Sequence, residues 1–258
     1  MQQSSEPIFN IPAVVVAVLA ALAAIHGARE LALGILSAAD REVLELFAFI
    51  PKRYETNVFG LEAYAGGLGA EIWTFVTYAL LHADVTHLVM NAAWFVPFGS
   101  AVARRFGPMR FLAFFAATAA AGAVVHLATH AGEGFPLIGA SAAVSGMMAA
   151  SVRFAFQPGG PLAEWQKRSP RSWQIPAVPL LSVLRDPRVV GFLAVWFGLN
   201  ILFGFGSLPI VGEGQRVAWE AHIGGFLAGL FLFSVFDPVP NQVSSGDSAG
   251  PENQIPSE

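Results

Sequence analysis

Residues 139–146 of this 258-residue chain read GASAAVSG, a run of small residues that continues as MMAA. The run carries two hydroxyl groups, on Ser141 and Ser145, inside a segment that is otherwise apolar. A hydroxyl transferred into an apolar environment costs free energy unless it finds a hydrogen-bond partner. Each serine is therefore either a hydrogen-bonding residue between packed helices or, for Ser141, a candidate nucleophile.

The composition around this run is that of an integral membrane protein. Hydrophobic residues make up 55% of the chain and charged residues 12%, against roughly 25% charged residues in average soluble domains. The mean hydropathy is +0.57, and so much apolar surface requires lipid. A net charge of −4 without a basic run gives nucleic-acid binding no support. The absence of cysteine excludes disulfides, thiolate metal sites and a cysteine nucleophile.

Six apolar segments are long enough, or nearly so, to cross a hydrocarbon core about 30 Å thick. They predict an all-α polytopic membrane protein with a six-helix bundle over residues 11–237. A cytoplasmic N-terminal tail (1–10) precedes it and a Pro/Ser/Gly-rich tail (238–258), predicted to be disordered, follows it. Within the long connection 29–84, the stretch EVLELFAFIP (42–51) predicts an interfacial helix. The six segments are roughly 11–28, 85–103, 110–130, 135–152, 189–206 and 217–236.

Basic residues in the short loops predict the orientation. The loop between the second and third segments carries Arg104, Arg105 and Arg110, and the loop between the fourth and fifth carries six basic residues. The loop between the third and fourth segments has none, and the next has only Arg216. We therefore expect both termini in the cytoplasm, and the first apolar run retained, because no basic signal region precedes it. A bacterial inner-membrane protein is the expected setting.

The second, fourth and sixth segments run in the same direction, and each carries polar residues near its extracytoplasmic start. The second begins HADVTHLVMN (82–91), with His82, His87 and Asn91. The fourth carries Ser141, and the sixth begins VAWEAHIGGFLAG (217–229), with His222. Equal distance from the entry end means similar depth, so these side chains are expected to converge in a shallow pocket. Polar residues inside a membrane are functional candidates by default.

The helix faces favour this convergence. His87 and Asn91 are four residues apart and share one side of a helix. Stripes of small residues, which let helix backbones approach closely, are expected to bring His222 near a serine. The stripes are Ala221, Gly225 and Gly229 on the sixth segment and Ala142 and Gly146 on the fourth.

This residue set predicts nucleophilic chemistry. A serine hydroxyl becomes a useful nucleophile when a base removes its proton, and a neutral histidine suits that task near pH 7. His87 and Asn91 offer N–H donors for the charge that develops on an attacked carbonyl oxygen. Glu220 lies two residues before His222, on a different helical face, so no acid completes a triad. We therefore expect a dyad of Ser141 and His222.

These motifs resemble the rhomboid intramembrane serine proteases over about residues 70–237. The resemblance is carried by GASAAVSG, by AHIGGFLAG (221–229) and by HADVTHLVMN followed by FGSAVARRFG (98–107). By motif position it implies that Ser141 is the nucleophile and His222 its base. It also implies that His87, Asn91 and the backbone N–H of Ser141 form the oxyanion hole. Supporting positions are His82, Gly139 of the G-x-S triplet and Gly225.

The resemblance also implies a substrate class and a route of entry. Members cleave transmembrane segments of other proteins near their extracytoplasmic end, with the first loop partly in the membrane and residues of about 205–216 gating entry. This chain departs from the family pattern at several positions. Ser145 replaces an aromatic residue that commonly stacks on the histidine, so another group must orient His222. The other departures are Ala142 in place of glycine, Ala103 in place of glutamate, and Trp73–Thr74 in place of a tryptophan–arginine pair.

Other readings of the chain compete with the protease. His126 and His130, four residues apart, raise a metal site together with His82 and His87. No HExxH motif, cysteine or carboxylate at ligand spacing accompanies them, so we expect neither a metal nor a cofactor. A non-catalytic, rhomboid-like protein that binds membrane clients is the alternative function. A histidine-based proton conductor or transporter is a third, but the chain lacks the repeat symmetry of transporters.

Overall fold

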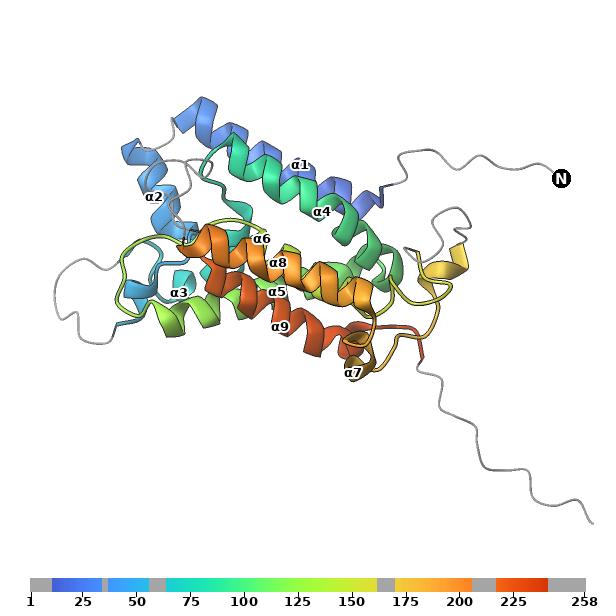
Figure 1. Ribbon diagram of the computed structural model, residues 1–258. Coiled ribbons are helices and arrows are strands. Elements are labelled where there is room, and N and C mark those ends of the chain that lie inside the picture. The colour runs from blue at the N-terminus through green and yellow to red at the C-terminus, as the bar shows by residue number, and fades with distance from the viewer. Residues whose placement is uncertain (1–10, 34–36, 56–63, 162–169, 206–216, 241–258) are drawn as a thin grey trace, which may run out of the picture.

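The computed structural model describes residues 11–33, 37–55, 64–161, 170–205 and 217–240. The expected N-terminal tail, most of the expected C-terminal tail and residues 206–216 of the expected gate (about 205–216) lie outside these residues. Within the described part of the chain the regular elements are helices, and strand pairing is limited to one isolated bridge between Phe49 and Leu137 (Figure 1). The all-α prediction is therefore confirmed.

Six apolar helices correspond to the six predicted segments. Four of them (α1, α4, α5 and α9) are long and apolar enough to cross a membrane, and α6 and α8 contribute shorter apolar helices. α4 runs without interruption past Pro97, beyond its expected end at residue 103. The six are α1 (Ala13–Ala28), α4 (Val85–Phe106), α5 (Pro108–Thr129), α6 (Ser141–Val152), α8 (Pro187–Phe205) and α9 (Trp219–Phe236).

The connection between α1 and α4 is more structured than the sequence predicted. The helix expected within residues 42–51 is present as α2, whose first turn is capped by the Ser37 hydroxyl, but it ends at Phe47. A further helix, α3, was not predicted because it begins at Gly67, directly after Gly66, and is short. The elements here are η1 (Arg29–Leu33), α2 (Ala38–Phe47), η2 (Pro51–Tyr54), α3 (Gly67–Thr77) and η3 (Tyr78–Leu80), and η5 (Pro170–Trp173) and α7 (Leu180–Val183) precede α8.

The start of α6 corrects a boundary expected at residue 135. Residues 135–140 are not helical, because their backbone groups bond elsewhere: Leu137 exchanges two hydrogen bonds with Phe49, and the Gly139 N–H donates to the Tyr78 carbonyl at 3.0 Å. Gly139 also has φ +115°, a value that L-residues rarely adopt. The helix therefore begins at Ser141 itself.

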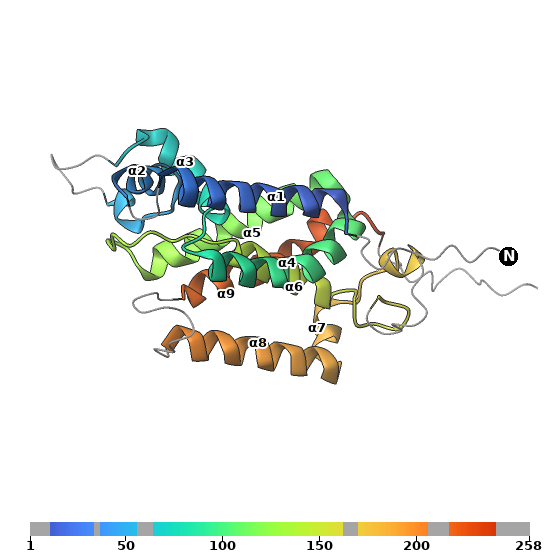
Figure 2. The same cartoon turned by 90° about the horizontal axis from the view of Figure 1, so that it is seen from above.

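α6 lies at the centre of the bundle, and small residues let α9 approach it closely. A Cβ added at Gly225 would collide with the backbone of Ala142, and one added at Gly229 would collide with the backbone of Gly146. The two predicted stripes therefore face each other, as expected from their spacing. α1 lies alongside α4, whereas α8 lies at one edge of the bundle (Figures 1 and 2). α8 meets α9 through Trp196, whose ring stacks on that of Phe226 at 4.5 Å.

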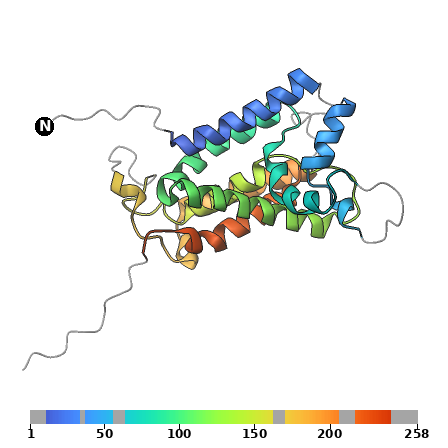
Figure 3. The same ribbon diagram turned by 180° about the vertical axis from the view of Figure 1, so that it is seen from behind.

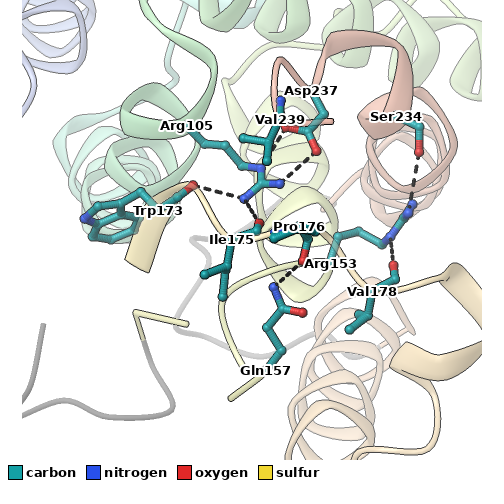
Figure 4. A network of polar contacts seen from close by, with 10 residues as sticks. All are labelled: Arg105, Arg153, Gln157, Trp173, Ile175, Pro176, Val178, Ser234, Asp237 and Val239. Atoms are coloured by element: carbon teal, nitrogen blue, oxygen red, sulfur yellow. Dashed lines mark hydrogen bonds and ion pairs between the residues drawn. The ribbon is translucent and has the colours of Figure 1, made fainter. Parts of the chain in front are cut away.

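The end of the bundle away from the start of α6 is held by a buried arginine. Arg105 lies inside α4 rather than in the expected loop, and its guanidinium makes two 2.8 Å hydrogen bonds to the Asp237 carboxylate after α9 (Figure 4). It also donates to the carbonyl oxygens of Trp173 and Ile175. The start of α1 lies at this same end (Figures 1 and 3). Because the number of apolar helices in the described part of the chain is even, the start of α1 and the end of α9 lie on the same side of the bundle.

Candidate active site

The structure brings Ser141 and His222 into contact at the other end of the bundle. Ser141 is the first residue of α6 and His222 lies in the first turn of α9. The Ser141 Oγ lies 2.8 Å from His222 Nε2, a hydrogen-bond distance. The close approach of α6 and α9 at Ala142 and Gly225 makes this distance possible, because any side chain at residue 225 would separate the helices.

Asn200 is the site residue that sequence reasoning missed. It lies on α8, and its Oδ1 is 2.7 Å from His222 Nδ1. Its own Nδ2 donates to the Trp196 carbonyl at 2.8 Å, which orients the amide so that the oxygen faces the imidazole. Since an amide oxygen only accepts, Nδ1 of His222 carries the proton and Nε2 presents its lone pair to the serine.

Asn200 is thus the group that orients His222, a role that Ser145 cannot fill in place of the usual aromatic residue. The Ser145 hydroxyl donates to the Ser141 carbonyl at 2.8 Å, within α6, and is a helix hydrogen-bonding residue. The orientation of His222 comes instead from α8. One signal could have identified Asn200: it is an isolated polar residue in the apolar run GFLAVWFGLNILFGF (191–205), where polar side chains are functional candidates.

His87 lies against the loop that precedes Ser141. A Cβ added at Gly139 would lie 2.7 Å from His87 Nε2 and 3.8 Å from Ser141 Oγ, so only glycine fits between them. The Ala83 N–H is directed at His87 Nδ1, at 3.4 Å. With Nδ1 accepting, Nε2 carries the ring proton and is a donor on the side of Ser141. The Asp84 carboxylate caps α4 by accepting from the His87 backbone N–H at 2.8 Å.

Two further donors belong to this end of the bundle. Asn91 is buried, and its Nδ2 donates one hydrogen to the His87 carbonyl at 2.9 Å, which leaves the second amide hydrogen for another acceptor. Because α6 begins at Ser141, the backbone N–H of Ser141 has no acceptor within the helix. The positive end of the α6 dipole lies at the same point and favours negative charge there.

His82 is completely buried and supports His87 from behind. The two rings meet edge to face at 5.1 Å between centroids. Its backbone carbonyl accepts a 2.7 Å hydrogen bond from Arg29, which in turn pairs with the buried Asp40. Burial is the main reason that the pKa of His82 is lowered to about 3, and the neighbouring His87 adds to the effect. The ring is therefore neutral at ordinary pH.

The predicted site residues thus gather at one end of the bundle. Ser141, His222, His87 and Gly139 lie together, and Asn91 and His82 contact His87 or its helix. The arrangement contains a hydroxyl paired with a neutral imidazole and N–H donors at a helix start. Chemically, these are the parts needed for nucleophilic attack on a carbonyl carbon.

Comparison with known proteins finds a matching family and a relative. Residues 69–237, more than half of the chain, match the family described as "Rhomboid domain". A curated relative is "RHOMBOID-like protein 12, mitochondrial" of Arabidopsis thaliana, which is 26% identical over 209 residues. The matched region covers 76% of this chain and 55% of that protein, so the chain spans about half the length of this relative.

Proposed function

Because the chain belongs to the rhomboid family, we propose that it is an intramembrane serine endopeptidase. Its substrates would be transmembrane segments of other membrane proteins, cleaved near their extracytoplasmic end. The observation that carries the proposal is the 2.8 Å distance between Ser141 Oγ and His222 Nε2. A client-binding role alone does not require a hydroxyl held against a histidine whose other nitrogen is also fixed.

In the first chemical step, His222 acts as a general base. Its Nε2 accepts the Ser141 proton while Oγ attacks the carbonyl carbon of the scissile peptide. Asn200 keeps the imidazole in the required tautomer, because its Oδ1 accepts from the Nδ1–H at 2.7 Å. The resulting imidazolium is stabilised by that same hydrogen bond, so no carboxylate is needed. Asn200 is a positioning residue, and Ser141 and His222 are the catalytic pair.

The carbonyl oxygen becomes negatively charged as the tetrahedral intermediate forms. We assign its stabilisation to the backbone N–H of Ser141, the Nε2–H of His87 and the second Nδ2 hydrogen of Asn91. Donors fixed before the reaction are effective in a site with little water, and losing one typically lowers turnover about 10²- to 10³-fold. His222 then gives its proton to the leaving amine, and the acyl-enzyme is hydrolysed by a water that His222 activates.

The proposed setting is the inner membrane of a bacterium. We propose that both termini are cytoplasmic and that the site opens toward the extracytoplasmic side, from the distribution of basic loops. The bilayer and the substrate helix are then the partners of the chain. Ser141 lies at the start of the short, central helix α6. For a peptide bond of the substrate to reach it, the substrate helix must unwind near the outer boundary of the membrane.

The test uses purified full-length chain in proteoliposomes with a reporter transmembrane substrate. Wild type is expected to cleave the substrate, and Ser141→Ala and His222→Ala each to abolish cleavage while insertion is unchanged. Ser145→Ala is the matched control, since its hydroxyl bonds only within α6 among the described contacts. A fluorophosphonate probe should label wild type at Ser141. Full cleavage by Ser141→Ala would refute the proposal, and client capture without cleavage by wild type would favour the non-catalytic alternative.

A further inference from the structure

A second group of polar side chains lies on the opposite side of the α9 start from Asn200, between α5 and α9. His126 and His130 are four residues apart on α5 and at its end, and Glu220 is in the first turn of α9. One ring nitrogen of each histidine and one carboxylate oxygen of Glu220 lie within 4.8 Å of one another. Sequence reasoning had excluded a carboxylate ligand because none is near these histidines along α5, but a different helix supplies it.

The hydrogen bonds around His130 leave its ligand atom available. The Thr129 hydroxyl lies 3.0 Å from the Val125 carbonyl and 2.9 Å from His130 Nδ1. Because the hydroxyl has one proton, which it gives to a backbone carbonyl, its oxygen accepts from the Nδ1–H of His130. The Nε2 lone pair then faces the Glu220 carboxylate, 3.8 Å away. Two electron-rich atoms in this position repel each other unless a positive charge lies between them, supplied either by a proton on His130 or by a metal ion.

His126, the other histidine of the group, is buried and, within the described part of the chain, lacks a hydrogen-bond partner on one ring nitrogen. It is 8% exposed, and its Nδ1 is buried with no hydrogen-bond partner in the described structure. Its ring stacks on that of His130 at 4.3 Å between centroids, so both imidazoles lie on one face of α5. A buried polar atom without a partner costs about 1–3 kcal/mol, and a ring nitrogen of this buried imidazole is one of the three ligand atoms that lie together.

From these contacts we propose that His126, His130 and Glu220 form a binding site for a divalent transition-metal ion, of which Zn²⁺ is the physiological candidate. Two imidazoles and a carboxylate favour Zn²⁺ and its neighbours over Mg²⁺ and Ca²⁺, which prefer all-oxygen sites. Tetrahedral coordination with bonds of about 2.0 Å places ligand atoms about 3.3 Å apart. The observed spacing needs to close by about 1.5 Å at most, which side-chain rotation can supply.

The site has the surroundings that such an ion needs. Thr129 would hold the second nitrogen of His130, as outer partners of metal-bound histidines do. The side chains of His130 and Glu220 are 24% and 15% exposed, so an ion can enter and keep a water as fourth ligand. A bound ion would tie the first turn of α9 to the end of α5, two residues before His222. The proposed metal site is separate from the Ser141–His222 pair, and no step of the serine chemistry uses the ion.

The test measures metal binding by tag-free, full-length chain in detergent, after chelator treatment. Co²⁺ is the spectroscopic probe, and Zn²⁺ competes with it. Wild type is expected to bind one Co²⁺ with the intense visible absorption of a four-coordinate ion, and Zn²⁺ should displace it. His130→Gln and Glu220→Gln should each weaken binding at least tenfold, and Thr129→Val about 10- to 100-fold through the outer partner.

The chain offers a matched control on α1. His26 and Glu30 form a similar histidine–glutamate contact at 3.5 Å, four residues apart, and belong to no such group of three among the described residues. His26→Gln should therefore bind Co²⁺ as wild type does, and so should Ser141→Ala. Absence of Co²⁺ binding below millimolar concentration would overturn the proposal and leave a simple His130–Glu220 ion pair. Equal affinity in His130→Gln and wild type would overturn it as well, whatever the proteolytic activity.

Discussion

Replacing Asn200 by alanine tests how the catalytic histidine is oriented. Asn200→Ala removes the acceptor for His222 Nδ1, at 2.7 Å, and leaves a partly buried N–H without that partner. Such a loss costs about 1–3 kcal/mol. At 1.36 kcal/mol for each factor of ten in rate, kcat should fall roughly 5- to 160-fold. KM should stay close to the wild-type value, because Asn200 holds the base and has no role in substrate binding.

The assay is cleavage of a reporter transmembrane substrate in proteoliposomes over a range of substrate concentrations. Asn200→Asp keeps an acceptor oxygen beside Nδ1 and is expected to recover part of the lost kcat. Ser151→Ala serves as the control, because it also removes a buried hydrogen bond, 2.8 Å from Ser151 Oγ to the Met147 carbonyl. Ser151 lies ten residues along α6 from the nucleophile, roughly 15 Å away, so kcat should be unchanged.

Two outcomes would contradict this reasoning. A folded Asn200→Ala variant with kcat within about twofold of wild type would mean that His222 is oriented without α8. A rise in KM with unchanged kcat would mean that Asn200 contributes to substrate binding. A fall in kcat for Ser151→Ala equal to that for Asn200→Ala would show that loss of any buried hydrogen bond disturbs the site.

Three further predictions follow from the packing around the site. Gly225→Ala should destabilise the bundle by about 1–3 kcal/mol, because the added Cβ meets the backbone of α6. Thermal unfolding in detergent measures this loss. The control Gly191→Ala should leave the stability unchanged, because a Cβ at residue 191 has nothing within 4 Å. Gly139→Ala should lower kcat at least 100-fold with insertion unchanged, because φ +115° and contact with the histidine donor both forbid a Cβ. Wild-type stability should fall as pH drops below about 6.5 toward 3, since His82 binds its proton more readily in the unfolded chain; His82→Gln should reduce this slope.

Much of the fold could be predicted because the apolar segments are long and the polar exceptions are few. The depth of Ser141 and His222 followed from the direction of their segments, and the distance between them followed from facing stripes of small residues. The start of α6 could not be predicted at Ser141. Residues 135–140 are apolar enough for a helix, and only backbone bonds to Phe49 and Tyr78 keep them out of one.

The contacts that Asn200 and Glu220 make could not be predicted from the sequence for a related reason. Each depends on which face of one helix meets another, and this is set by packing far from the residue in the chain. Asn200 meets the imidazole because Trp196, one turn earlier, stacks on Phe226. Glu220 was judged from its own helix, where it indeed points away from Ser141, but α5 lies on that side and presents His130.

The position of α9 explains how one helix can serve both groups. Each residue turns an α-helix by about 100°, so a shift of one residue would move His222 away from Ser141 and Glu220 away from α5 together. Such a shift is blocked at the start of α9 by Gly225 against Ala142 and further along by Gly229 against Gly146. Beyond its end, Asp237 is held by two hydrogen bonds from Arg105. The ion pair at one end of the bundle therefore contributes to the geometry of the serine–histidine contact at the other.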